Sequence, residues 1–154
     1  SYTLTFNVSK YTAQEKEQLY IANTEYAKYP RYVNTRKKDT TFYTTTKTLG
    51  KYTLKKDSLK PEVKILYIDN KQWITSAKTL KVKVSDVDSG IKNWRATIDD
   101  SWVLMQYNHK KGILTYNFSD KILAGSKHIF KIVLSDNVGN TTERSITFFK
   151  KQTK

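Results

Sequence analysis

The sequence contains no cysteine, which excludes disulfide bonds, thiolate metal ligands and cysteine nucleophiles. Its two histidines, His109 and His128, each lack a second ligand at the spacing of a zinc site, and no serine lies in a GxSxG elbow. The five glycines are scattered, so there is no phosphate-binding loop. No apolar run approaches the roughly 18 residues of a membrane-spanning helix. The sequence therefore predicts a chain with no catalytic site and no transmembrane segment.

Positive charge is abundant, since 28 Lys and Arg against 14 Asp and Glu give a net charge of +14. Residues 1–56 carry 11 cations against 4 anions and residues 57–154 carry 17 against 10, so each part contributes +7. Lysines such as Lys81 and Lys83 occupy alternate positions of strand-like segments, as on a solvated sheet face. This even spread argues against a nucleic-acid partner. It leaves the binding of another anionic polymer open.

From residue 61 onward, apolar residues alternate with polar ones, which is typical of half-buried strands. Short turn signals such as Asp88-Ser89-Gly90 separate the runs. The segment 128–136 is apolar on both faces and is therefore predicted to be a central strand. Seven strands are expected, at about 63–67, 80–84, 94–98, 102–107, 114–118, 128–136 and 141–149. That number in fewer than about 100 residues predicts an immunoglobulin-like β-sandwich.

Residues 1–57 predict a smaller β-rich domain with one short helix. Strands are expected at 2–8, 19–23, 40–46 and 50–55, with loops at Pro30 and in the "TRKKD" run of residues 35–39. Thr12 and Glu15 match a capping box for a helix over about residues 12–19. Because so few elements make a thin core, we expect this domain to lack residues upstream or to lean on the sandwich.

The predicted fold class is thus all-β, with a small domain at 1–57 and the sandwich at 58–154. Pro61 supports this boundary, because it biases Lys60 towards an extended backbone at the entry to a new domain.

Carboxylates gather in the turns of the second domain. The pairs Asp86/Asp88 and Asp99/Asp100 resemble the paired acids of glycoside cleavage, but both lie where Asp accepts hydrogen bonds from turn amides. In a sandwich, the entry to the first strand and two of the loops meet at one end, which would bring Asp57, Asp86, Asp88 and Asp136 together. These hard oxygen ligands predict either an interdomain calcium site or turn-forming residues only. No other cofactor is expected.

Three aromatic residues are candidates for ligand binding. Trp94 occupies the third-strand position where sandwiches bury a tryptophan, so it is assigned to the core. An exposed Trp or Tyr ring beside Lys and Asn residues can stack on a sugar or a base, and Trp73, Trp102 and Tyr107 are the candidates for such a site. Packing in the interior is the alternative for each.

Several segments resemble the C-terminal region of Bacteroidetes-type secreted zinc endopeptidases of the lysostaphin-like, peptidoglycan-cleaving class. The resemblance spans about residues 4–149 and rests on "TKTLGKYTLKKDSLKP", "DVDSGI", "RATIDDSWVLMQY", "LTYNF" and "SDNVGNTT". It implies a β-rich piece and an immunoglobulin-like domain that follow the catalytic domain and carry none of its zinc ligands. Asp99-Asp100-Ser101 departs from the family, because a glycine-containing hairpin turn is expected there.

The resemblance implies a non-catalytic, extracytoplasmic accessory module, located in the periplasm or at the cell surface. Because residue 1 begins directly on a strand-like pattern, with no charged-then-apolar leader, we expect any export signal to have been removed. Its expected partner is the upstream catalytic domain of the same parent chain, and its expected role is to position or tether that peptidase. The alternative is a module that binds cell-wall carbohydrate or another anionic polymer.

Overall fold

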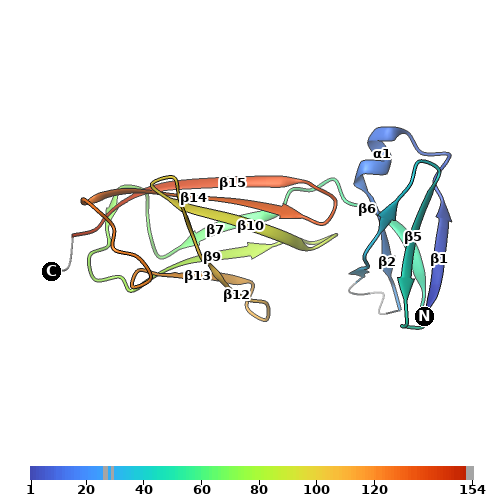
Figure 1. Ribbon diagram of the computed structural model, residues 1–154, viewed down its shortest axis with the longest axis horizontal. Coiled ribbons are helices and arrows are strands. Elements are labelled where there is room, and N and C mark those ends of the chain that lie inside the picture. The colour runs from blue at the N-terminus through green and yellow to red at the C-terminus, as the bar shows by residue number, and fades with distance from the viewer. Residues whose placement is uncertain (26–27, 29, 152–154) are drawn as a thin grey trace. The chain divides into compact units, whose positions relative to one another are not determined.

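The computed structural model describes residues 1–25, 28 and 30–151, which fold into two compact units (Figure 1). The first unit contains Ser1–Leu59 together with the loops Asp86–Gly90 and Asp136–Asn140. The second contains Lys60–Ser85, Ile91–Ser135 and Thr141–Lys154. The division after Leu59 lies close to the boundary after residue 57 that the sequence predicts, and two loops of the later segment belong to the first unit.

The first unit holds two three-stranded antiparallel sheets. One has the order β1-β5-β4, with β1 at Tyr2–Asn7, β5 at Thr41–Thr46 and β4 at Arg36–Lys37. The other has the order β3-β2-β6, with β3 at Arg31–Tyr32, β2 at Leu19–Asn23 and β6 at Tyr52–Lys56. The prediction that the "TRKKD" run is all loop is wrong, because Arg36 and Lys37 pair with Tyr43 and Phe42.

A short helix, α1 at Ala13–Gln18, precedes β2. The predicted capping box is confirmed: the Glu15 amide donates to Thr12 Oγ1 over 3.2 Å, and the Thr12 amide donates to Glu15 Oε2 over 2.9 Å. At six residues, α1 falls short of what a membrane-crossing helix requires, and the described residues contain no longer helix. The core of this unit is thin, as expected, and comprises the buried side chains Val8, Leu19, Ile21 and Phe42.

The second unit is a β-sandwich, so the predicted all-β, immunoglobulin-like fold class is confirmed. Its five-stranded sheet has the order β11-β10-β14-β15-β8, with strands at Ser101–Val103, Ile91–Ile98, Lys127–Asp136, Thr141–Phe149 and Gln72–Trp73. Its four-stranded sheet has the order β12-β13-β9-β7, with strands at Gln106–Asn108, Ile113–Asn117, Thr79–Ser85 and Glu62–Leu66.

Alternating side chains from the two sheets fill one interior. Leu80, Val82 and Val84 of β9 are buried, while the lysines between them are exposed. In the other sheet, β14 lies between β10 and β15 and buries Phe130 and Ile132. The sequence therefore identified this central strand correctly.

Within the described residues, the sandwich has nine strands, where seven were predicted. The expected single strand at 102–107 is wrong, because the chain leaves the five-stranded sheet after Val103 and joins the four-stranded sheet at Gln106. The second strand that was not predicted is the short β8, which pairs in parallel with the end of β15. Alternation of apolar and polar residues reveals neither the change of sheet nor β8, because both depend on which sheet lies within reach of the chain.

The turn between β10 and β11 explains the missing glycine. Ile98 pairs with Ser101, so Asp99 and Asp100 form a two-residue hairpin loop with φ values of 49° and 62°. Such a loop requires left-handed backbone at both positions, which Asp tolerates better than most residues because its short side chain bonds locally. The Asp99 side chain also holds this turn to the neighbouring strand β14, because its Oδ1 accepts a hydrogen bond from the Ile129 amide over 2.8 Å.

Candidate cation site and exposed aromatic residues

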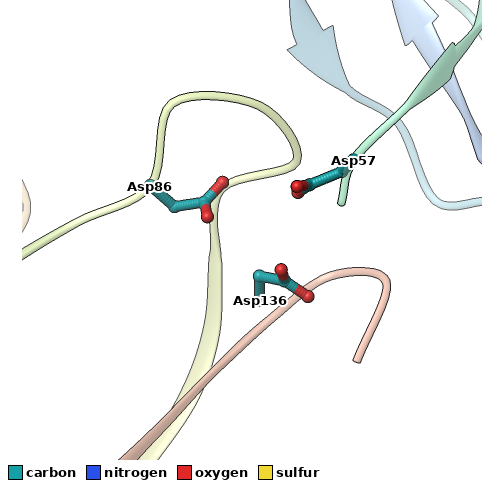
Figure 2. Close-up of side chains that lie close together, drawn as sticks. All are labelled: Asp57, Asp86 and Asp136. Carbon is teal, nitrogen blue, oxygen red and sulfur yellow. The ribbon is translucent and has the colours of Figure 1, made fainter. Parts of the chain in front are cut away.

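Three aspartates from distant parts of the sequence meet in the first unit. Asp57 follows β6, Asp86 follows β9 and Asp136 ends β14. One carboxylate oxygen of each lies within 4.8 Å of the others, and Figure 2 shows the three side chains converging from separate segments. Asp57 and Asp136 are fully buried, whereas Asp86 is half-buried. The cluster therefore combines three of the four residues predicted from the sequence.

Asp136 organises the loop that follows it. Its Oδ1 accepts hydrogen bonds from the amides of Val138, Gly139 and Asn140 over 3.0, 2.7 and 2.8 Å, and its Oδ2 accepts one from Asn140 Nδ2 over 2.7 Å. Gly139 has a φ of +104°, a conformation that L side chains rarely adopt. The "DNVGN" segment is thus a closed turn built around one buried carboxylate.

Asp86 organises the other loop in the same way. Its Oδ1 accepts hydrogen bonds from the amides of Asp88 and Gly90 over 3.1 and 2.7 Å. The fourth predicted ligand, Asp88, therefore contributes its amide here, and its carboxylate is not one of the three that converge. No hydrogen bond to Oδ2 of Asp86 is found among the described residues.

Asp57 joins its own segment to the Asp86 loop. Its Oδ1 accepts a hydrogen bond from the Leu59 amide over 3.1 Å, and its Oδ2 accepts one from the Ser89 amide over 3.0 Å. Asn140 Nδ2 also donates to the Leu59 carbonyl over 2.9 Å. The three segments of the cluster are therefore linked by hydrogen bonds as well as by proximity.

Burial and like charge both act on the cluster. The pKa of Asp86 is raised, chiefly by burial and also by the charges of Asp57 and Asp136, although its two amide donors oppose the shift. Nearby, burial raises the pKa of Tyr20 to about 12, and the charges of Asp88, Asp57 and Asp86 add to this effect. No Lys, Arg or His forms an ion pair with the three aspartates in the described part of the chain.

The oxygen ligands suit a hard cation such as calcium, which takes about six to eight oxygens. The three carboxylates offer part of that shell, but five of their six oxygens already accept hydrogen bonds. The residues therefore fit the turn-forming role fully and the calcium role in part. Calcium at this cluster stays a prediction.

The predicted ligand-binding aromatics lie in separate places. Trp73 on β8 is 54% exposed and stacks on Phe149, with 5.2 Å between ring centroids. Trp102 on β11 is 56% exposed, whereas Tyr107 lies on β12 of the other sheet and packs against Trp94 at 5.0 Å. Trp94 is half-buried and packs against the core, as expected. The rings of Trp102 and Tyr107 therefore belong to different sheets, and each exposed Trp stands as its own candidate surface.

One pair of polar residues has no signal in the sequence. His128 is buried, and its Nδ1 lies 2.7 Å from Asp99 Oδ2, although the two are 29 positions apart. His128 Nε2 has no hydrogen-bond partner among the described residues. The pairing depends on the adjacency of β10 and β14, which no spacing rule reveals. The carboxylate fixes the orientation of the imidazole, and the same Asp99 holds the Ile129 amide.

Comparisons with known proteins give structural neighbours only. No protein-family model matches the sequence, and no curated protein matches it significantly. An endo-beta-1,4-mannanase from Thermotoga petrophila is similar over 63% of this chain and 21% of its own, with 14% identity and a TM-score of 0.49. Fibronectin(III)-like modules of Clostridium thermocellum CbhA are similar over 97% of this chain and 86% of their own, with 13% identity and a TM-score of 0.47.

A third solved structure, CopC from Methylosinus trichosporium OB3b, is similar over 54% of this chain and 85% of its own, with 17% identity and a TM-score of 0.41. This chain therefore spans about a fifth of the mannanase and most of the other two. With TM-scores below 0.5, these similarities support no inference about activity.

Proposed function

We propose that this chain is a non-catalytic, extracytoplasmic accessory module that positions or tethers a peptidoglycan-cleaving peptidase. The observation that carries the proposal is that the clustered carboxylates accept hydrogen bonds from backbone amides of the loops around them. Asp57 and Asp86 each accept two backbone amides and Asp136 accepts three, so their acceptor capacity holds loops in place. A general acid or base needs access to a substrate proton, which two fully buried carboxylates lack.

The identity of the parent protein rests on the sequence resemblance to the lysostaphin-like zinc endopeptidases. The proposed partner is the upstream zinc-peptidase domain of the same parent chain, which would carry the zinc ligands, since neither His109 nor His128 has a second ligand at the spacing of a zinc site. The extracytoplasmic location follows from the same resemblance. The proposed mechanism is recognition through the protein surface, with no bond made or broken.

The parent protein provides the test. Its activity would be measured with and without residues 1–154, on purified peptidoglycan sacculi and on a short synthetic peptide substrate. An accessory module predicts a loss of at least tenfold on sacculi and less than twofold on the peptide. An equal loss on both substrates, or a reading frame with no peptidase upstream of Ser1, would refute the proposal.

A second candidate function is the binding of cell-wall glycan or another anionic polymer. It is favoured by three exposed lysines, Lys64, Lys81 and Lys83, which adjacent strands bring to one sheet face. Co-sedimentation of the 154-residue chain with sacculi at low and high salt tests it, because screening weakens contacts between exposed charges. No retention at low salt would exclude this candidate.

A further inference from the structure

The outward face of the four-stranded sheet brings together lysines that the sequence spreads over 20 positions. Lys64 on β7 lies directly opposite Lys83 on β9, and Lys81 lies one outward-facing position further along β9. All three are exposed, while Val63, Val82 and Val84 between them point into the core. Directly opposite Cβ atoms are about 5 Å apart, and positions i and i+2 of one strand are about 6.6 Å apart. The Cβ atoms of the three lysines therefore lie close together on one sheet face, here called the lysine face.

Like charges directly opposite one another destabilise a sheet. In the described residues, no carboxylate forms an ion pair with any of the three lysines. Lys83 Nζ instead donates to the Lys111 carbonyl, which satisfies a hydrogen bond but neutralises no charge. The lysine face thus has an electrostatic cost that an anionic partner would remove.

A groove adjoins the lysine face along β7. Its volume is about 870 Å³, and it continues past Lys64 and Lys83 to residues at the start of β15. Lys60 and Arg144 add two further cations to its lining. It also contains two carboxylates, of which Glu143 is already paired with Lys131 over 3.1 Å and Glu62 accepts a hydrogen bond from Ser85. With four cations, Lys60, Lys64, Lys83 and Arg144, against these two carboxylates, the lining has a net formal charge of +2, which favours an anionic ligand.

Neutral hydrogen-bonding groups lie beside the lysines on the same face. Thr115 of β13 is opposite both Lys81 and Gln106, and Asn108 of β12 is in the row of Lys83. Gln106 and Asn108 are exposed. The side chain of Gln106 offers both a donor and an acceptor, whereas Asn108 offers its Nδ2 donor, because its Oδ1 already accepts a hydrogen bond from the Lys111 amide over 3.1 Å. The outward positions of β7, β9, β12 and β13 contain no aromatic residue. The face therefore lacks rings on which a base or a sugar could stack, so a ligand bound there is held by charges and hydrogen bonds.

We propose that the lysine face binds a linear glycan that carries both carboxylates and amide groups. The lysines pair with the carboxylates, and Gln106 and Asn108 exchange hydrogen bonds with the amides. This inference rests on the second candidate function and specifies its ligand chemistry. A phosphate polymer would pair with the lysines but would offer no amide groups to Gln106 and Asn108. An uncharged acetamido glycan would offer amide groups but no charge to pair with the lysines.

Four probes separate these contributions when they are titrated into the full 154-residue chain by calorimetry. Solubilised peptidoglycan strands carry carboxylates and amides, polygalacturonate carries carboxylates alone, chitin oligomers carry amides alone, and inorganic polyphosphate carries phosphates. We expect the affinity to be highest for the peptidoglycan strands. Single-stranded DNA serves as a fifth probe for nucleic acid.

The test variant is Lys64→Gln/Lys81→Gln/Lys83→Gln. Its matched control, Lys92→Gln/Lys121→Gln/Lys127→Gln, removes the same charge from exposed positions outside the face. The test variant should lose at least tenfold in affinity for the peptidoglycan strands and the control less than threefold. The affinity of the test variant should also depend less steeply on salt than that of the control, because salt screens contacts between exposed charges. All six lysines are exposed, so circular dichroism should show both variants to be folded.

Three outcomes would overturn the inference: equal losses in both variants, tighter binding of polyphosphate or DNA than of peptidoglycan strands, or unchanged binding in the test variant. Each is distinguishable from failure of the accessory role. If the parent protein still needs residues 1–154 for activity on sacculi, only the lysine face is refuted.

Discussion

Replacing Asp136 with alanine tests whether the acidic cluster holds the loops in place. The substitution removes the acceptor of three backbone amides and of Asn140 Nδ2, while the carboxylate it deletes is fully buried. A buried donor left without a partner costs about 1–3 kcal/mol. Because the amides of the loop itself are only partly buried, water would recover part of that cost. We expect a net loss of about 3–5 kcal/mol in the free energy of unfolding.

Urea unfolding, followed by tryptophan fluorescence and far-ultraviolet circular dichroism, measures this loss. The matched control is Asp120→Ala, which makes the same chemical change at an exposed turn and should cost less than about 0.5 kcal/mol. Asp136→Asn should fall between the two, because Oδ1 is retained while the acceptor for Asn140 becomes a donor. A loss below about 1 kcal/mol in Asp136→Ala would refute the reasoning, because a buried amide acceptor of this kind cannot be dispensable.

The same unfolding experiment separates the two roles foreseen for the cluster. A calcium ion bound only by the folded chain would add about 2.7 kcal/mol at a concentration of 100 times its Kd. If the sequence-based prediction of calcium is right, wild type gains stability in calcium relative to chelator, and Asp136→Ala does not. If the wild-type curves coincide at millimolar calcium, the aspartates act only as turn formers.

Three further predictions concern a charge, a glycine and an exposed ring. The pKa of Asp86 is raised in the folded chain, which therefore binds a proton more readily than the unfolded chain, so the free energy of unfolding falls as pH rises through that pKa. Asp86→Asn should therefore stabilise the chain more at pH 7 than at pH 4, and a pH-independent difference would contradict this. Gly112→Ala should cost more than about 2 kcal/mol, because φ is +61° and a Cβ would lie 2.8 Å from the Val84 carbonyl oxygen, whereas Gly125→Ala meets no atom within 4 Å and should cost about 1 kcal/mol in thermal melts. Trp102→Ala should change stability by less than about 1 kcal/mol, since the ring is 56% exposed; a larger loss would show that it is part of the core.

Local chemistry explains which parts of the fold the sequence predicted. The alternation Leu80, Val82, Val84 identifies a strand without any knowledge of its partners, because successive side chains of a strand point to opposite faces. The Thr12 and Glu15 capping box is equally local, since both partners lie within one helical turn. The aspartates of the cluster were also within reach, because turn residues at one end of a sandwich must converge.

Other features required the strands to be placed first. The chain crosses between sheets at Leu104 and Met105, and whether a strand continues or changes sheet depends on curvature and on the neighbours available. The sequence could not distinguish the carboxylate of Asp88 from that of Asp86, because only the folded loop shows which one turns towards Asp57.

By itself, the sequence determined the all-β class, the turns and the residues that face the core, because each of these depends on neighbours a few positions away. Only the tertiary structure decided that Asp99 meets His128, that three aspartates converge and that Lys64 stands opposite Lys83. Those contacts follow from strand order and register, which the whole chain settles together when it buries its apolar faces, and no local pattern encodes them.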